Sequence, residues 1–225
     1  MKVNLERNNA SQTKRLVLVA GNIGAGKTSL TKLIGQKLGW QMGFEEVDNP
    51  YLGRFYQDMA AWAFHLQLFH LGHRSKQMIA AHKAKESYIL DRSLYEDMHI
   101  FTRALRQLGN IQEDDYNTYK SVYDLVVQSL PDPDLLLYLK APVDSIIDRI
   151  NQRGRDIEKG IPKDYLQLLD SYYEDWIEAY DLSPVLTIPS GDLDFVNQPG
   201  HMDIVVAKIQ EKLAGKEDVV FPNGN

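Results

Sequence analysis

One glycine-rich segment near the N-terminus limits the folds open to this chain more than any other feature. Gly21 to Thr28 reads GNIGAGKT and fits the pattern G-x-x-x-x-G-K-[ST]. It stands between an apolar run, LVLVA, and a stretch with the spacing of an amphipathic helix. Backbone N–H groups of such a loop can close around anionic oxygens, and the helix N-terminus adds positive potential. The segment therefore predicts a phosphate-binding loop rather than a glycine-rich turn without a ligand.

The residues of this loop have separate expected roles. Lys27 should reach the outer phosphates of a nucleotide, and Thr28 can ligate Mg²⁺. The predicted ATP-binding residues are Gly21, Asn22, Ile23, Gly24, Ala25, Gly26, Lys27, Thr28, Ser29, Arg149 and Arg153. The chain has no N-K-x-D and no L-S-G-G-Q sequence, which argues against a GTPase switch and a transporter ATPase. The loop thus favours a small-molecule kinase that uses ATP with Mg²⁺.

Apolar runs and helical patterns alternate along the rest of the chain. Strands are predicted over residues 16–20, 87–90, 135–139 and 185–188, with a weaker fifth over 44–47. Helices are predicted over residues 27–38, 51–84, 94–108, 113–129, 143–152 and 163–180. The 51–84 region is long and contains Gly72, so we expect a break or two packed helices there. The alternation predicts a three-layer α/β fold of P-loop NTPase type, with a five-stranded parallel sheet flanked by helices.

The same pattern predicts how the chain divides. A single domain is expected over residues 15–214, with flexible tails at 1–14 and 215–225. No apolar run approaches the length of a membrane span, and the N-terminus is too polar for a signal peptide, so a cytoplasmic protein without membrane contact is expected.

Charge and cysteine content narrow the chemistry. The formal net charge of −6 opposes binding to a nucleic acid polymer, so a small-molecule partner is expected. The sequence has no cysteine, which excludes disulfides, zinc–thiolate sites and cysteine nucleophiles. Any catalysis must therefore use oxygen and nitrogen side-chain groups, with or without a hard metal ion such as Mg²⁺.

A second motif, Asp91-Arg92-Ser93, follows the predicted strand over residues 87–90. Ligands bind at this edge of open α/β sheets. Asp91 could hold a magnesium-bound water, while Arg92 could steady the nucleophile or the transferred phosphoryl group. The alternative is a helix-capping Asp or Ser beside a surface arginine.

Two carboxylates, Glu45 and Glu46, end the weaker predicted strand. Neighbouring residues on a strand point to opposite faces, so only one of them should face the site. A positioned carboxylate can orient a hydroxyl nucleophile and accept its proton, an effect of about 10²- to 10⁴-fold. A solvated pair at a strand end is the alternative.

Three arginines crowd the end of the predicted helix over residues 143–152. Arg149, Arg153 and Arg155 run into a glycine-containing segment, which predicts an arginine-rich lid over about residues 153–161. Arginines that close over a triphosphate would neutralise developing charge and exclude water. A basic helix C-terminus that complements the helix dipole is the alternative.

Taken together, these motifs resemble the deoxyribonucleoside kinase family, the cellular deoxycytidine, deoxyguanosine and deoxyadenosine kinases, and especially its bacterial members. The resemblance covers about residues 16–195 and rests on GNIGAGKTS, FEEVDNPYLGRFY, QLFHLGHR, DRSLYED and RINQRGRDIEKGIP. It implies ATP- and Mg²⁺-dependent transfer of a phosphate to the 5′-hydroxyl in nucleoside salvage. It also implies a homodimer built through the long helices over residues 51–84 and 94–130. The runner-up is a nucleoside monophosphate kinase of the thymidylate kinase type, followed by a nucleotide-binding regulatory protein without phosphotransfer.

The resemblance also implies roles for single residues. Glu45 becomes the general base, with Glu46 as the alternative, and the other catalytic residues are Arg92, Lys27, Arg153 and Arg155. Tyr56 and Glu158 match the pair that holds the sugar 3′-hydroxyl. The nucleoside-binding set is therefore Glu45, Tyr56, Gln67, Arg92, Asp97 and Glu158, and the metal-binding pair is Thr28 with Asp91.

Base preference follows from the residues that match base-reading positions, Gln67 and Asp97, with Arg74 behind them. Gln67 offers a donor and an acceptor, whereas an ionised Asp97 can only accept. An exocyclic amino group satisfies that acceptor, so we rank deoxyadenosine first and deoxycytidine second, and keep deoxyguanosine because an arginine could neutralise Asp97. The family's animal members carry Glu-Pro-Val where this chain has Glu-Glu-Val, so the stacking aromatic is open, with Phe101 as a candidate.

Overall fold

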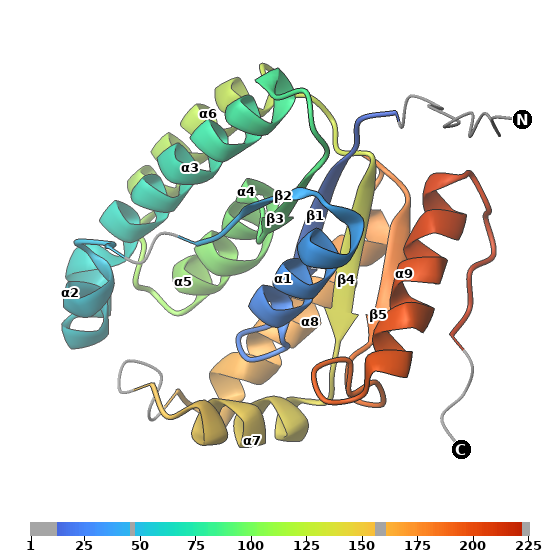
Figure 1. Cartoon of the computed structure of the whole chain (residues 1–225). Coiled ribbons are helices and arrows are strands. Elements are labelled where there is room, and N and C mark those ends of the chain that lie inside the picture. Colours follow the sequence, from blue (N-terminus) through green and yellow to red (C-terminus); the bar gives the residue numbers. More distant parts are fainter. Residues whose placement is uncertain (1–12, 46–47, 156–160, 222–225) are drawn as a thin grey trace, which may run out of the picture.

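Five parallel strands form the central sheet, in the order β2-β3-β1-β4-β5 (Figure 1). The computed structural model describes residues 13–45, 48–155 and 161–221. The strands are β1 (Leu16–Gly21), β2 (Gln41–Gly43), β3 (Tyr88–Asp91), β4 (Leu135–Lys140) and β5 (Val185–Pro189). Val19 of β1 lies opposite Asp91 on one side and Leu137 on the other. Since the carboxyl ends of parallel strands share one edge, the segments after β1, β2 and β3 meet there.

Helices cover both faces of this sheet, which confirms the three-layer prediction (Figure 1). They are α1 (Lys27–Leu38), α2 (Leu52–Gln57), α3 (Met59–Lys83), α4 (Leu94–Glu96), the π-helical η1 (Asp97–Thr102), α5 (Arg103–Gln107), α6 (Glu113–Val127), α7 (Val143–Arg153), α8 (Lys163–Ala179) and α9 (Pro199–Leu213). One face packs against α1 and α9, and the other against α3, α4, α6 and α8.

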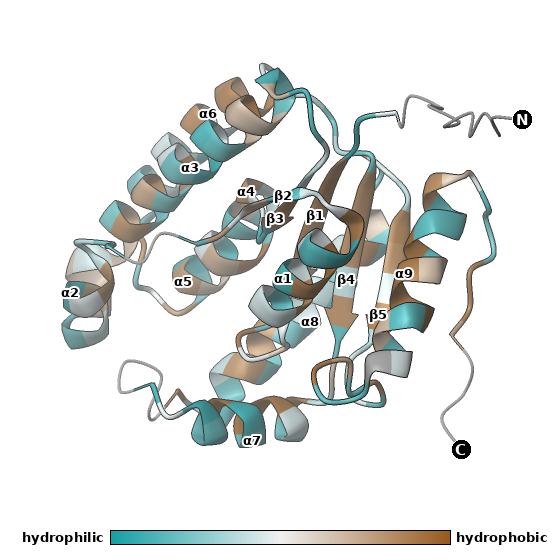
Figure 2. Ribbon diagram, in the orientation of Figure 1, coloured by the Kyte–Doolittle hydropathy of each residue, from teal (hydrophilic) through white to brown (hydrophobic). Residues whose placement is uncertain are grey.

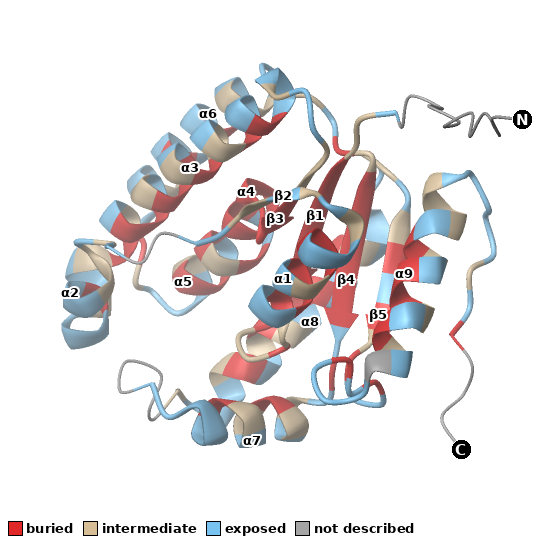
Figure 3. Ribbon diagram, in the orientation of Figure 1, coloured by how far each residue is buried: buried red, intermediate tan, exposed pale blue. Residues whose placement is uncertain are grey.

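Alternate residues of each strand supply these two cores. Val17 and Val19 belong to the cluster with α1 and α9, whereas Leu16, Leu18 and Ala20 belong to the cluster on the opposite face. The central strands β1 and β4 are apolar along almost their whole length and buried on both sides (Figures 2 and 3). Full burial of each large aliphatic side chain stabilises a fold by about 1.5–3 kcal/mol. The sheet is therefore a rigid platform for the segments at its edge.

The long helical region is broken, as the sequence predicts, but not near its glycine. Asp58 has extended backbone angles, φ −150° and ψ 92°, and its side chain accepts a hydrogen bond from the Ala61 N–H at 3.0 Å as the N-cap of α3. Gly72 lies inside α3, which runs on without interruption. The position of the break is therefore set by the N-cap at Asp58 and not by Gly72.

One predicted strand was misplaced, and one helix was not predicted. The second strand is β2, which pairs with β3 from Gln41 to Gly43. Residues 44 and 45 of the strand predicted over 44–47 are not in a strand, and residues 46–47 lie outside the described ranges. The prediction missed β2 because it is a short edge strand with a weak apolar pattern. The sequence pattern also gave no helix after residue 180, where α9 forms and packs Val205 and Ile209 on the sheet. No helix in the described ranges combines the length and apolar character needed to cross a membrane.

The division into one domain with two tails stays a prediction. Phe221 lies inside the expected C-terminal tail, yet its ring is buried in the cluster with α9.

Candidate active site

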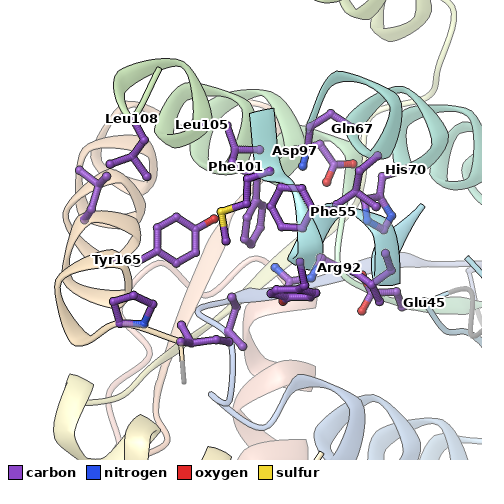
Figure 4. A pocket seen from close by; sticks show the side chains of 18 of the residues that line it. Glu45, Phe55, Gln67, His70, Arg92, Asp97, Phe101, Leu105, Leu108 and Tyr165 are labelled. Carbon is purple, nitrogen blue, oxygen red and sulfur yellow. The ribbon is translucent and has the colours of Figure 1, made fainter. Parts of the chain in front are cut away.

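A cavity of about 780 Å³ opens beside the sheet edge where β1, β2 and β3 end. Its size suits a small organic ligand, since such sites usually span about 300–1,000 Å³. In Figure 4, Glu45 and Arg92 lie at one end and Gln67, Asp97 and His70 line another part of the wall. Other lining residues come from α2, η1, α5 and α8 and include Phe55, Tyr56, Phe101, Leu105 and Tyr165. Apolar walls with few polar groups are typical of a binding site.

The glycine-rich loop connects β1 to α1 with positive φ at each of its three glycines, Gly21, Gly24 and Gly26. Gly24 has φ +83°, and a Cβ there would lie 2.9 Å from Ile150 of α7. Gly26 has φ +104° and is the N-cap of α1, with no side-chain hydrogen bond to that helix end. The first-turn N–H groups of α1 are thus not satisfied by a side-chain cap, which is the arrangement that binds phosphate.

Lys27 folds back over this loop. Its Nζ donates to the carbonyl oxygens of Gly21 and Asn22, both at 2.8 Å. Burial, and then the positive charge of Arg92, lower the pKa of Lys27 to about 7. A bound polyphosphate would favour the charged form.

Asn22 and Arg149 hold the loop from two sides. The Asn22 side chain is buried and donates to the Leu166 carbonyl oxygen of α8 at 2.9 Å. Arg149 of α7 donates to the Ala25 carbonyl oxygen at 3.2 Å and to the Ser190 carbonyl oxygen. These contacts fix the loop's shape between two helices.

An oxygen pair suited to Mg²⁺ lies beside the loop. The Thr28 hydroxyl donates to Asp91 Oδ2 at 2.5 Å, so a hydroxyl and a carboxylate meet where a nucleotide's phosphates would lie. Mg²⁺ commonly takes one or two protein oxygens, substrate phosphates and waters. The pair fits the ion, which when bound would neutralise charge on the outer phosphates.

Arg92 follows β3 with φ +79°, a backbone conformation that is rare outside glycine. Its guanidinium lies 4.7 Å over the Phe101 ring and is buried. Such a conformation costs of order 1–3 kcal/mol and persists only where the surroundings hold it. The strained backbone therefore makes Arg92 a candidate functional residue.

Glu45 lines the same cavity as Arg92. Its Oε1 accepts from Arg74 Nη2 at 3.1 Å. Enclosure by the cavity walls raises the pKa of Glu45, but the positive charges of Arg92 and then Arg74 outweigh it and lower the pKa to about 2. The carboxylate is therefore ionised at neutral pH. Glu45 lies beyond the end of β2, so the argument from strand alternation does not apply to it, and Glu46 lies outside the described residues.

Gln67, Asp97 and Arg74 meet on one wall. Arg74 is 4% exposed and pairs with Asp97, which is 1% exposed. Among the described residues, Gln67 Oε1 and Asp97 Oδ2 are buried without a hydrogen-bond partner. Buried acceptors are rarely left open in native proteins. Both belong to residues that line the cavity, so a ligand with hydrogen-bond donors would satisfy them.

His70 was not foreseen from the sequence. It lies one helical turn beyond Gln67 on α3, and that spacing was the available signal. Burial, and then the charge of Arg74, lower the pKa of His70 to about 3. A neutral imidazole, with one donor and one acceptor, therefore lines the cavity.

The remaining predicted residues are placed in part. Tyr56 and Arg155 line the cavity, and Arg153 is the last residue of α7. Thr28 and Ser29 are exposed at the start of α1. Glu158 and the rest of residues 156–160 of the expected lid lie outside the described residues.

Comparison with known proteins decides the family. The family model for deoxynucleoside kinases matches residues 17–214. The chain belongs to the deoxynucleoside kinase family.

Relatives of this deoxynucleoside kinase differ in the base they are named for. A deoxyadenosine/deoxycytidine kinase of Bacillus subtilis is 37% identical over 86% of this chain and 91% of its own length. A deoxyguanosine kinase of the same organism is 34% identical, over 88% of this chain and 98% of its own length. The solved deoxyadenosine kinase of M. mycoides with bound dATP has a TM-score of 0.75 and 31% identity, covering 87% of this kinase and 99% of that chain. The transferase assignment made from the motifs is thereby confirmed.

Proposed function

We propose that this kinase transfers the γ-phosphate of ATP, with Mg²⁺, to the 5′-hydroxyl of deoxyadenosine first, and then of deoxycytidine or deoxyguanosine. The observation that carries the base preference is the pair of open acceptors, Gln67 Oε1 and Asp97 Oδ2, on the cavity wall. Adenine and cytosine present an exocyclic amino group to such acceptors, whereas thymine has a carbonyl oxygen where cytosine has its amino group. Buried polar groups left unpaired reject an analogue by factors up to about 10⁴.

The other roles are proposed from the motifs and the family resemblance, and those of Glu45, Arg92 and Tyr56 are supported by their place in the cavity wall. Glu45 is the base that orients the 5′-hydroxyl, and Arg92 steadies the attacking and transferred groups. The phosphate loop with Lys27 holds the triphosphate, Thr28 and Asp91 hold Mg²⁺, and Arg149, Arg153 and Arg155 neutralise charge. Tyr56 and Glu158 hold the sugar 3′-hydroxyl. In-line transfer then depends on positioning and electrostatics more than on covalent chemistry.

A nucleoside panel tests this function. The four deoxyribonucleosides, their ribose counterparts and thymidine monophosphate would each be supplied with ATP and Mg²⁺ in a coupled assay. We expect deoxyadenosine to give the highest kcat/KM and thymidine the lowest among deoxyribonucleosides. Thymidine monophosphate as the preferred acceptor would instead identify a nucleoside monophosphate kinase. ATP binding with no acceptor phosphorylated would support a regulatory protein.

A Gln67→Leu variant sharpens the same panel. Removing the open acceptor should lower kcat/KM for deoxyadenosine by about 10- to 100-fold, because a buried hydrogen bond to the base is lost. Lys76→Ala is the control, since Lys76 is an exposed residue of the same helix, α3. An unchanged ranking of bases in Gln67→Leu would remove Gln67 from base reading.

We also propose that the kinase is a cytoplasmic homodimer. Four apolar side chains stay exposed on α3 and α6, which pack together: Leu68, Ile79, Val122 and Leu125. A second copy of the chain covering them would remove this apolar area from water. A monomer mass in light scattering would contradict this assembly.

A further inference from the structure

A fully buried carboxylate that the reaction does not explain lies beneath the active site. Glu96 is 0% exposed and is the last residue of α4. Its Oε2 accepts from the Ser93 N–H at 2.8 Å and the Ser93 hydroxyl at 3.2 Å, which completes a capping box with Ser93. That bond set accounts for one oxygen only.

The second oxygen, Glu96 Oε1, has three partners on other segments. It accepts from the Tyr173 hydroxyl at 2.6 Å, from the Gly21 N–H at 3.3 Å and from Arg92 Nη1 at 3.4 Å. Gly21 begins the phosphate loop and Tyr173 lies on α8, which follows the expected lid. One carboxylate oxygen therefore links the phosphate loop, Arg92 and α8.

Tyr173 strengthens this junction. It is 0% exposed, and its hydroxyl oxygen accepts from Arg92 Nη1 at 3.2 Å. It also lies 2.8 Å from the Gly21 carbonyl oxygen. A hydroxyl has one proton, and the carboxylate of Glu96 is the stronger acceptor for it. The oxygen's lone pairs then remain turned toward Arg92.

These contacts hold Arg92 in its strained backbone conformation. Arg92 has φ +79°, and the same Nη1 contacts Glu96 and Tyr173. A residue in that conformation needs surroundings that over-determine it. Buried charged hydrogen bonds supply such a constraint, and Phe101 closes the other side of the guanidinium at 4.7 Å.

We propose that Glu96 and Tyr173 are positioning residues that hold the Arg92 guanidinium, and with it the first glycine of the phosphate loop, in register for phosphotransfer. The inference rests on the proposed function, because it assigns Arg92 to the reacting groups. Neither Glu96 nor Tyr173 is among the residues that line the cavity. Both act through Arg92 and Gly21, so their effect should appear in turnover more than in binding.

Glu96→Gln separates the two roles of this side chain. Glutamine also serves in the capping box, so the turn at Ser93 is kept. Its single carbonyl oxygen cannot replace both carboxylate oxygens, and its NH₂ group would face the donors of Arg92 and Gly21. The helix start stays intact while the hold on Arg92 is lost.

The test uses kcat, KM and a double-mutant cycle on the full chain. Glu96→Gln should lower kcat by up to about 10²-fold, with smaller changes in KM for ATP and deoxyadenosine. Tyr173→Phe should lower kcat by a smaller factor. In an Arg92→Met background, Glu96→Gln should lower the single-turnover rate by a clearly smaller factor, because the guanidinium is gone and only the contact with Gly21 remains to be lost.

Tyr172→Phe is the matched control. Tyr172 is the preceding residue on α8, is buried, and donates its hydroxyl to Gln107, away from the phosphate loop. Equal losses in Tyr172→Phe and Tyr173→Phe, or an equal factor for Glu96→Gln with and without Arg92, would overturn the proposal. A wild-type protein that phosphorylates no nucleoside would instead overturn the proposed function. If Glu96→Gln fails to fold, Tyr173→Phe in the two backgrounds gives the same comparison.

Discussion

Glu45→Gln should lower kcat by about 10²- to 10⁴-fold while nucleoside affinity stays nearly unchanged. Glutamine can still hydrogen-bond a 5′-hydroxyl, but it cannot accept the proton that the hydroxyl gives up. Turnover measured in a coupled assay and nucleoside affinity measured by calorimetry would separate the two effects. Glu45→Asp, which keeps the charge on a shorter side chain, should retain part of the rate that Glu45→Gln loses. Full turnover in Glu45→Gln would exclude Glu45 as the base.

The same residue sets an expectation for pH. The pKa of Glu45 is lowered to about 2, so its basic form is present throughout the range above that value. Loss of activity as the pH falls from 7 to 5 should therefore not come from protonation of Glu45. An acid limb in that range that disappears in Glu45→Gln would contradict this assignment.

Arg74→Met should produce the largest loss of stability, about 3–5 kcal/mol in the free energy of unfolding. Arg74 and Asp97 form a pair in which the side chains are 4% and 1% exposed, so the variant leaves a carboxylate buried without its counter-ion. Urea unfolding followed by tryptophan fluorescence would measure the change. A loss below about 1 kcal/mol would show that water reaches Asp97 in the folded protein.

Two variants control this prediction. Arg74→Met with Asp97→Leu removes both charges and should recover much of the stability, since an apolar pair often replaces a buried ion pair without loss. Glu45→Gln removes the other partner of Arg74, but the Glu45 side chain is 47% exposed. It should therefore cost less than about 1 kcal/mol.

The sequence alone was enough to predict the sheet where its strands are buried on both faces. β1, β3 and β4 have continuous apolar runs and β5 a mostly apolar one, and each end lies within one residue of its predicted position. β2 was misplaced because an edge strand of three residues, exposed in part, has no such run. Its register comes from pairing with β3, which is a tertiary contact.

The candidate site was predictable where a motif carries the chemistry. Lys27, Thr28 and Asp91 meet because a loop after β1 and the end of β3 share one sheet edge. Gln67 and Asp97 were named from the resemblance, and the cavity wall they share is a product of how α3 packs on η1. Their roles in base reading stay predictions.

Glu96 and Tyr173 show what sequence reasoning missed. Ser93-x-x-Glu96 fits a capping box, so a signal for a helix start was present. Nothing in the pattern showed that the other oxygen of Glu96 would meet Tyr173, a residue far away in the chain. This contact depends on how α8 packs on the sheet, and the local sequence pattern does not predict that packing.

The two helices that begin at Gly26 and Asp58 differ in how their first turn is completed. For α3, the carboxylate of Asp58 performs that task from within the chain. For α1, no side chain in the described part of the protein does so, and a phosphate of ATP would serve in its place. A bound nucleotide would thus act as the N-terminal cap of α1. Nucleotide binding should therefore stabilise the first turn of this helix, and loss of the nucleotide should destabilise it.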